Sequence, residues 1–501
     1  MKYLIGVDIG TQGTKAAIYD TGGRQIAAVT EASNLITPQP GTVMQEPDEI
    51  FASVLHTIRG VMGRSGVSAS DVAALAFDGQ MAGVMGVGED FEAVTYYDSW
   101  LDTRCEPYIE MMKNKARKRV VELTGCPITY AHGPKILWWK HEHPDIYEKI
   151  RKFVMVHGYA AGRLCGLKAK DAFIDYTNIH FTGYADNKNK QWSRELLDIF
   201  EIDPGKMPAI VAPWKQVGTI QKEYADQCGL SAGTPVMAGC GDSAATSLGA
   251  GIVRVGQVFD VAGTASIFSC CVDTYVPDVT HEAMLQMRSV IDGFWQPLAY
   301  INGGGLCVRW FKDDIARSDY DTLEREASEV APGAEGLVFN PHLSGRVCPN
   351  NPNVKGSFIG LDWRHGRGHM YRSILEGIAY EYRYYLEVLR DIGVGQDFSA
   401  VSVMGGGARS GLFNQIKANV LGLEYQVLKN SDTATLGCAL IAGYGAGIYS
   451  DIAATVESFV ETGETLRPDG SHEDVYARQY ACYKEQFDAL GGIYKRLKSG
   501  E

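Results

Sequence analysis

Asp8 ends an apolar run near the start of the chain and precedes a turn rich in Gly and Thr, within LIGVDIGTQGTKAAIYD over residues 4–20. The hydroxyls of Thr11 and Thr14, the backbone N–H groups of the turn and the Lys15 ammonium are groups that hold phosphate oxygens. An acid beside such a turn can hold Mg²⁺ through water. A tight hairpin turn with an exposed acid is the structural alternative, because the glycines suit such a turn whatever the function.

Asp242 is a second candidate, in MAGCGDSAATSLGAG over residues 237–251. Asp is a preferred N-cap residue, so capping the helix that follows is the structural alternative. Gly239 and Gly241 would let a ligand approach closely, and ligands bind at the carboxyl ends of strands in open α/β sheets. We therefore expect Asp242 to be functional.

Two further glycine turns could contact a nucleotide. VAGTAS, with Gly263 and Thr264, repeats the groups of the first turn, and two facing phosphate loops would clamp a nucleotide between domains. VMGGGARSGLFNQI, over residues 403–416, predicts a strand, a glycine turn and a helix that starts near Ser410. A dinucleotide fold would look similar, but the spacing from Gly405 is G-x-G-x-x-S, which does not match its fingerprint. No G-x-x-x-x-G-K-[ST] loop occurs, which excludes a P-loop NTPase.

The elements around these residues predict an α/β fold with largely buried sheets, because Val- and Ile-rich runs alternate with amphipathic stretches. Residues 71–77 and 234–240 are expected to be strands, and each leads to an acid and glycines. Pro47 and the acids after it begin a predicted helix. Residues 372–393 predict a long helix closed by its final glycine, and the polar tail from about residue 452 is expected to be helical.

A weak internal repeat predicts the domain organisation. YLIGVDIGTQGTKAAIYD at the start has a counterpart in GQVFDVAGTASIFSCCVD over residues 256–273. Both have an apolar run, an Asp, a Gly-Thr turn and a second apolar run. Two halves built on one plan would join near residue 250, so we expect domains at residues 1–249 and 250–501.

Composition excludes several classes of protein. The chain has 501 residues and a formal net charge of −13, which would repel a nucleic acid backbone. No apolar run approaches the ~18 residues that a membrane helix needs, and the start does not resemble a signal peptide. Eleven cysteines without a C-x-x-C pair argue against a zinc site or a disulfide framework. We expect a cytoplasmic protein, with a homodimer left open.

The motifs together resemble the FGGY carbohydrate kinase family nearly end to end, and xylulokinases most within it. The matching segments are GVDIGTQGTK, GQMAG, SWLDTR, PKILWW, GCGDSAATSLGAG, GTAS, FNPHLSGRVCPNNPNVKGSFIGL and GGGARSGLFNQI. The resemblance implies two actin-like ribonuclease-H-type domains with a cleft between them. It also implies ATP and Mg²⁺ in the cleft, and phosphate transfer to a hydroxyl of a small sugar, above all a pentulose such as D-xylulose.

The resemblance also implies roles for individual residues. Asp242 would be the catalytic base, with an ordinary carboxylate pKa of about 4, and Asp8 the Mg²⁺ contact. The positions that would hold ATP are Thr11, Gln12, Gly13, Lys15, Gly263, Thr264, Gly305, Gly406, Gly407 and Asn414. The positions that would bind the acceptor sugar are Gln80, Met81, Ala82, Trp100, Asp102, Asp242 and Ser243.

Three departures from the xylulokinase pattern concern the acceptor. Ala82 stands where the family usually has His, Ser243 where it has Asn, and Leu101 where Asn is common. A site that reads hydroxyls by hydrogen bonds discriminates strongly through such changes. Another ketose or a polyol is therefore an alternative acceptor. A non-catalytic sugar-binding protein and a nicotinamide-dependent oxidoreductase are the alternatives from other classes.

Overall fold

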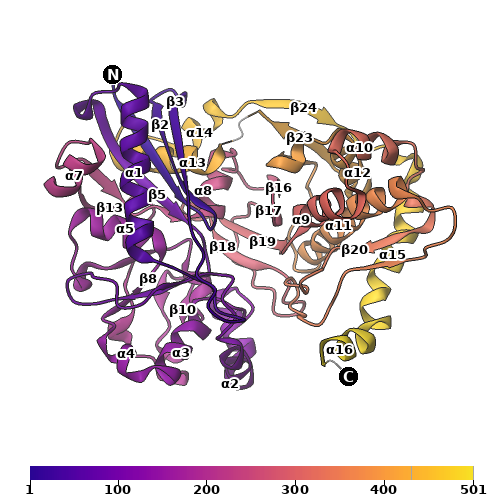
Figure 1. Ribbon diagram of the computed structural model, residues 1–501, viewed down its shortest axis with the longest axis horizontal. Helices are drawn as coiled ribbons and strands as arrows, with labels where there is room; N and C mark the ends of the chain where they lie inside the picture. The colour runs from indigo at the N-terminus through magenta and orange to yellow at the C-terminus, as the bar shows by residue number, and fades with distance from the viewer. Residues whose placement is uncertain (430–431, 500–501) are drawn as a thin grey trace.

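Two seven-stranded mixed sheets organise the computed structural model, which describes residues 1–429 and 432–499. Figure 1 shows one sheet in each half of the molecule, with helices packed around both. The expected α/β fold with two sheet-centred halves is confirmed.

The first sheet has the strand order β13-β14-β5-β1-β2-β3, with β15 also paired to β5. β1 pairs antiparallel with β2 and parallel with β5. Its strands are β1 (Tyr3–Ile9), β2 (Gly13–Asp20), β3 (Gln25–Ala32), β5 (Val72–Gly79), β13 (Gln216–Thr219), β14 (Pro235–Met237) and β15 (Cys240–Gly241).

The second sheet repeats this plan in the order β18-β19-β17-β16-β22-β23-β24. β16 and β17 form an antiparallel hairpin and β16 pairs parallel with β22, as β1 does with β2 and β5. Its strands are β16 (Val258–Ala262), β17 (Ser266–Cys270), β18 (Leu285–Arg288), β19 (Trp295–Ile301), β22 (Ala400–Met404), β23 (Glu424–Leu428) and β24 (Thr462–Leu466). The predicted repeat is therefore present in three dimensions.

Short antiparallel or parallel pairs complete the strands: β4 (Met44–Gln45) with β7 (Tyr97–Asp98), β6 (Met85–Val87) with β8 (Lys152–Val154), β9 (Phe173–Asp175) with β12 (Ala209–Val211), β10 (Ala185–Asp186) with β11 (Gln191–Trp192), and β20 (Val338–Asn340) with β21 (Ser357–Ile359).

The helices before residue 250 are α1 (Pro47–Ser65), α2 (Glu106–Thr124), α3 (His132–Glu142), α4 (Pro144–Lys149), α5 (Val156–Cys165), α6 (Arg194–Ile199), α7 (Lys222–Cys228) and α8 (Asp242–Gly249). Those after it are α9 (Gly304–Trp310), α10 (Tyr320–Ser328), α11 (Arg367–Asp391), α12 (Gly411–Leu421), α13 (Thr433–Gly445), α14 (Ile452–Phe459), α15 (Glu473–Ala489) and α16 (Gly491–Ser499). The predicted helix from Pro47 is α1, and its buried apolar face packs on β2 and β3.

α13 crosses from the second half to the first. It packs against β1, β5 and α8, and Figure 1 shows it beside α8 and β2. Glycines permit this approach: a Cβ on Gly437 would lie 2.1 Å from the carbonyl oxygen of Ala245, and one on Gly6 would lie 1.9 Å from that of Thr435. The domain boundary between residues 249 and 250 stays a prediction. α13 lies after this boundary in the sequence but packs on elements that lie before it.

Three predicted elements differ in detail from the structure. The strand at 234–240 is two pieces, β14 and β15, because the chain turns at Gly239, whose φ is +79°. The long helix, α11, begins at Arg367 and ends at Asp391. The expectation of a wholly helical tail is wrong at β24, which completes the edge of the second sheet although its residues are mostly exposed and polar.

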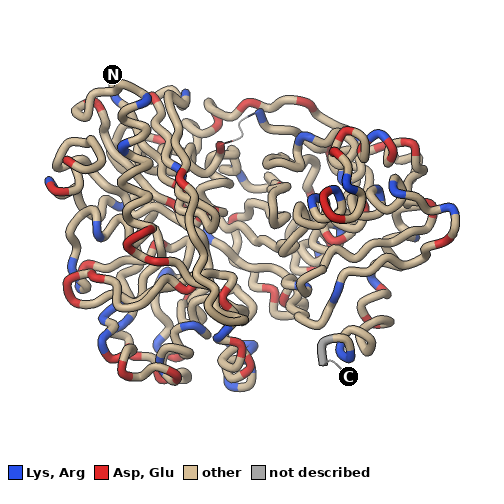
Figure 2. Tube along the Cα trace, viewed as in Figure 1, with Lys and Arg blue, Asp and Glu red and all other residues tan. Residues whose placement is uncertain are grey.

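Charged residues of both signs are interspersed over both halves in the view of Figure 2. Among the residues that the structure describes, no helix is long and apolar enough to cross a membrane.

Candidate functional site

Three carboxylates gather at one end of the first sheet. Asp8 lies opposite Asp78 in the parallel register of β1 and β5. Asp242 begins α8 directly after β15, whose Gly241 is paired with Gly79 of β5. Parallel strands end at the same edge of a sheet, so the fold brings together Asp8 and Asp242, which are 234 positions apart in the sequence. Asp78 is a site residue that the sequence analysis left without a role, although its position after a predicted strand matches that of Asp8.

Burial and mutual repulsion raise the pKa values of this group. Burial raises the pKa of Asp8, and burial together with the Asp8 charge raises that of Asp78 well above its usual range. Burial and the Asp8 charge raise the pKa of Asp242 to about 6, although hydrogen bonds from Ser243 oppose the shift. The expectation of an ordinary pKa for Asp242 is therefore wrong. Because repulsion disfavours the ionised forms, a cation at this end of the sheet would stabilise the group.

The donor set fits Mg²⁺. Carboxylate oxygens are hard ligands, and Mg²⁺ is usually held by one or two of them while it keeps water and phosphate ligands. Within residues 1–429 and 432–499, no three His, Cys, Asp or Glu side chains form a cage that could hold a metal ion. An ion held through Asp8, water and phosphate needs no such cage. The role of Asp8 stays a prediction.

The structural alternative expected Asp242 to be the N-cap of α8, but it is not. Gly241 is the N-cap, and Asp242 is the first helical residue. Its Oδ1 accepts hydrogen bonds from the Ser243 N–H at 2.6 Å and the Ser243 hydroxyl at 3.2 Å. Ser243, predicted to contact the sugar, thus orients the carboxylate of Asp242.

Thr11 lies on the side of the site where the predicted sugar contacts are. The Trp100 indole N–H donates to the Thr11 hydroxyl at 2.8 Å, and that hydroxyl donates to Gln80 Oε1 at 3.2 Å. Gln80 is buried and donates to Gln45 Oε1 at 2.6 Å. Thr11 was predicted to contact ATP, but its hydroxyl bonds two residues that were predicted to bind the acceptor sugar.

Asp102 is buried and already has partners. Its carboxylate accepts hydrogen bonds from the Val43 N–H and from Arg104, which also pairs with Asp98. This arrangement fixes the segment that carries Trp100. Next to Gln80, Met81 is buried, and Ala82 has φ +62°, in the region that side chains rarely adopt.

The remaining predicted residues of the first turn lie in different surroundings. Gln12 is exposed, and Gly13 is close to the carbonyl of Glu31, which leaves no room for a side chain. Lys15 pairs with Asp432 at 2.7 Å, and both charges act on Asp8. The Thr14 hydroxyl is wholly buried and bonds Ser53 of α1 at 2.6 Å, so the expectation that it faces phosphate is wrong.

Five predicted nucleotide contacts line one hollow of about 610 Å³ in the second half: Gly263, Thr264, Gly305, Gly406 and Gly407. Tyr320, Tyr371 and Phe413 also line it, with Arg309 and Arg409. A Cβ on Gly305 would lie 2.1 Å from the carbonyl oxygen of Gly263, so only glycine allows α9 to approach the turn this closely. Aromatic side chains, two exposed arginines and glycine turns suit a nucleotide.

Asn414 does not line this hollow. It is buried, and its amide donates to the Ala408 carbonyl at 2.7 Å, which holds the glycine turn from behind. Glu324 of α10 was not predicted: its carboxylate accepts from the Ser410 hydroxyl at 2.7 Å and the Leu412 N–H at 3.0 Å, at the start of α12. No motif in the sequence links α10 to this helix.

The start of α13 contacts residues beside the carboxylates and beside the glycine turn of the second half. Asp432 pairs with Lys15 beside Asp8, and the hydroxyl of the next residue, Thr433, contacts the sulfur of Met404, directly before the glycine turn. α13 therefore links the two groups of predicted residues through neighbouring contacts.

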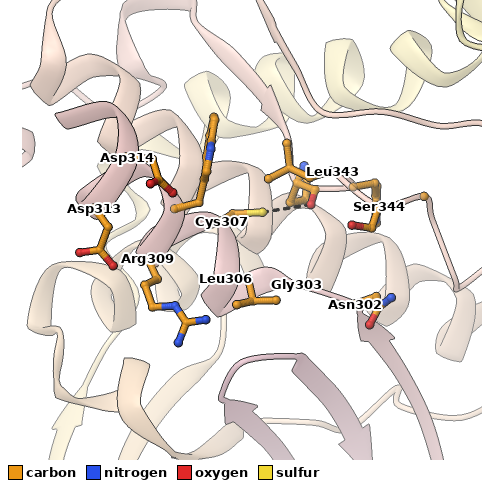
Figure 3. Close-up of a pocket in the computed structure, with 13 residues that line it drawn as sticks. Asn302, Gly303, Leu306, Cys307, Arg309, Asp313, Asp314, Leu343 and Ser344 are labelled. Carbon is orange, nitrogen blue, oxygen red and sulfur yellow. Dashed lines mark hydrogen bonds between the residues drawn. The ribbon is translucent and has the colours of Figure 1, made fainter. Parts of the chain in front are cut away.

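A second hollow, of about 240 Å³, lies on the other flank of α9. Figure 3 shows Leu306 and Arg309 among its lining residues, and these two also line the larger hollow. Asp313 and Asp314 follow on the π-helical turn Phe311–Ala316. α9 thus separates two spaces, and only the larger one contains the predicted glycines.

Comparisons with known proteins agree with this geometry. Residues 3–249 match the model of the N-terminal domain of the FGGY family of carbohydrate kinases, and residues 261–446 match that of its C-terminal domain. A gluconokinase of Bacillus subtilis is 28% identical over 459 residues, covering 89% of this chain and 88% of the relative. A xylulose kinase of the same organism is 25% identical over 502 residues, covering 100% and 99%. The crystal structure of a ligand-bound xylulose kinase from Lactobacillus acidophilus superimposes with a TM-score of 0.92, at 25% identity, covering 99% and 100%.

Proposed function

Because the chain belongs to the FGGY family of carbohydrate kinases, we propose that it transfers the γ-phosphoryl group of ATP to a hydroxyl of a small sugar. D-xylulose, a pentulose, is the first acceptor to test. The observation that carries the proposal is that the predicted glycines line one hollow in the second half, while Asp8 and Asp242 lie at one end of the sheet of the first half.

Asp242 is proposed as the base. Phosphoryl transfer depends on positioning, charge neutralisation and a group that accepts the proton of the attacking hydroxyl. With a pKa of about 6, Asp242 is mostly ionised at pH 7, and it binds a proton more readily than an ordinary carboxylate. Ser243 holds one carboxylate oxygen through two hydrogen bonds, which leaves the other free to meet the acceptor.

Asp8 is proposed to hold Mg²⁺ through water, and the ion would supply positive charge to the phosphates of bound ATP. The glycine turns at Gly263 and Gly406 are proposed to carry backbone N–H groups to those phosphates. Lys15, beside Asp8, adds a positive charge at the same end of the sheet, balanced by Asp432.

The identity of the acceptor is the finer part of the proposal. Relatives that are 25% and 28% identical are named for two different substrates, xylulose and gluconate, so the comparisons support a sugar kinase more coarsely than a xylulose kinase. Trp100, Gln80 and Thr11 form a hydrogen-bonded wall that favours a polyhydroxylated ligand. Family membership contradicts the oxidoreductase alternative. A cytoplasmic location and a homodimer stay predictions.

The test is a coupled assay of ADP release, with ATP and Mg²⁺, across D-xylulose, D-ribulose, L-ribulose, xylitol, erythritol, glycerol and D-gluconate. We expect one acceptor to raise ADP release far above the rate without sugar, and mass spectrometry to find that acceptor one phosphoryl group heavier. A non-catalytic sugar-binding protein would bind an acceptor in calorimetry but release no more ADP in its presence.

A further inference from the structure

A lysine and an aspartate form a buried ion pair in the second half, and the proposed mechanism does not use it. Lys417 of α12 and Asp260 of β16 are both 0% exposed, and their Nζ and Oδ2 atoms are 2.5 Å apart. The hydroxyl of Tyr382 on α11 donates to the other carboxylate oxygen of Asp260 at 2.8 Å. Replacing such a pair by apolar residues of similar volume is often neutral or stabilising. The pair therefore needs an explanation other than stability.

Asp260 is the counterpart of Asp8 in the internal repeat. In both halves the acid comes shortly before a Gly-Thr turn, at residues 10–11 in the first half and 263–264 in the second. Asp8 is partly exposed, whereas Asp260 is enclosed and has Lys417 beside it. The protein itself offsets the charge of Asp260, as a buried charge requires. The second half thus uses the acid of the shared plan to join elements.

The three partners belong to three elements that line the larger hollow, the one of about 610 Å³. The lining residues on these elements are Ala262, Gly263 and Thr264 for β16 and its turn, Tyr371 and Leu375 for α11, and Phe413 for α12. The ion pair and the tyrosine hydroxyl therefore fasten three sides of the hollow to one another without forming its surface.

Lys417 also contacts the aromatic wall of the hollow. Its Nζ lies 4.2 Å from the centroid of the Phe413 ring, within the range of a cation–π contact. The glycine turn before α12 rests on the end of β16, because a Cβ on Gly407 would lie 2.9 Å from the Cβ of Ala262. A shift of α12 against β16 would therefore move both Phe413 and the glycine turn.

We propose that the Lys417–Asp260 pair positions α12 and its glycine turn against β16 and its Gly-Thr turn, and so sets the affinity for ATP without contacting it. The inference rests on the proposed function, which takes the larger hollow as the ATP site. The predicted acceptor contacts lie in the first half, so we expect the pair to leave acceptor binding unchanged.

The experiment compares wild type with Lys417→Met, with Asp260→Leu combined with Lys417→Met, and with Tyr382→Phe. Lys417→Met leaves a buried carboxylate without its cation, which destabilises the fold. The double variant removes both charges, so it separates the loss of positioning from the burial of an unpaired charge. Tyr382→Phe removes one hydroxyl and is the mildest of the three changes.

Arg346→Met is the matched control, because Arg346 also forms a buried ion pair in the second half. Its guanidinium donates to Glu381 at 2.8 Å, and the Tyr483 hydroxyl donates to the same carboxylate at 2.7 Å. Glu381 adjoins Tyr382 on α11. None of these control residues, Arg346, Glu381 and Tyr483, is among the described residues that line the larger hollow.

Calorimetry with a non-hydrolysable ATP analogue and Mg²⁺ gives the Kd, steady-state kinetics at saturating ATP give the acceptor KM, and thermal melting reports folding. We expect the Kd to rise about tenfold in Lys417→Met and in the double variant, and less in Tyr382→Phe. The acceptor KM should stay at the wild-type value. Arg346→Met should melt at a lower temperature but bind the analogue as wild type does.

If Lys417→Met fails to fold, the double variant and Tyr382→Phe provide the test. Wild-type affinity in the folded double variant would overturn the proposal. An equal loss of affinity in Arg346→Met would overturn it too, because the effect would then follow stability and not position. A wild-type enzyme that binds no ATP analogue would instead overturn the proposed function itself, so the two failures are distinguishable.

Discussion

Asp242 combines a base position with a pKa that its surroundings raise to about 6. Only the ionised form can accept the proton of the attacking hydroxyl. Its fraction falls as the pH drops through that pKa. We predict that kcat/KM for the acceptor decreases about tenfold per pH unit below this value and is flat above it. A pH profile with saturating ATP checks this.

The companion variant is Asp242→Asn, which keeps the size of the side chain and removes the base. We expect kcat to fall by roughly 10²–10⁴ while calorimetry still detects ATP binding, because the base acts only on the acceptor hydroxyl. If the variant kept more than about a tenth of wild-type kcat, the carboxylate of Asp242 would be a structural feature of the helix start.

Ala82 tests the relation between this chain and the xylulokinase pattern. Ala82→His restores the family imidazole at a backbone position with φ +62°, which His tolerates better than most residues. We predict that it improves kcat/KM for D-xylulose and impairs it for the preferred acceptor, by about tenfold in each direction.

Ala82→Gly is the control, because glycine accepts this backbone conformation without adding an imidazole. If wild type already prefers D-xylulose and Ala82→His is worse on it, the departures at Ala82, Leu101 and Ser243 do not alter specificity.

At the scale of elements, α9 depends on Gly305 for its approach to the turn at Gly263. A side chain there would be 2.1 Å from the Gly263 carbonyl oxygen, so Gly305→Ala must displace either the helix or the turn. We predict that ATP affinity falls about tenfold or more. The measurement is calorimetry with ATP and Mg²⁺.

Gly411→Ala is the matched control. Gly411 also begins a helix beside the hollow, but a Cβ there meets no atom within 4 Å. Its ATP affinity should match that of wild type. Equal affinity in both variants would show that the approach of α9 to the turn is irrelevant to nucleotide binding.

At the scale of the whole molecule, the two halves join where α8 packs on α13. A Cβ on Gly249 would lie 1.9 Å from the Thr433 carbonyl oxygen, so this crossing is tightly packed. One hydrophobic core cluster spans both halves, and another lies wholly in the first. A sugar kinase needs its halves to close on the substrates and exclude water, and we expect them to move about this crossing.

We predict that the acceptor and a non-hydrolysable ATP analogue together reduce the radius of gyration in X-ray scattering, and that ADP release without acceptor is slow. The acceptor alone, or the ATP analogue alone, should reduce the radius of gyration less than the two together. Equal rates of ADP release with and without every sugar would contradict closure as the step that protects ATP from water.

Much of the framework could be predicted from the sequence. Local patterns carry it: the alternation of apolar runs gave the α/β class, the repeated Asp and Gly-Thr pattern indicated two similar halves, and Asp8, Asp242 and the glycine turns were found by their positions after apolar strands. Such signals are short-range, because strand, turn and helix start each depend on a few neighbouring residues.

The tertiary structure alone decided which groups share a site. Asp78 stands beside Asp8 only because β1 and β5 are parallel neighbours, and Lys15 meets Asp432 only because α13 returns to the first sheet. Burial and nearby charge, which no local pattern encodes, raise the pKa of Asp242, and only the fold brings Lys417 to Asp260. Solvation and pairing depend on contacts between distant segments, and those contacts exist only in the folded chain.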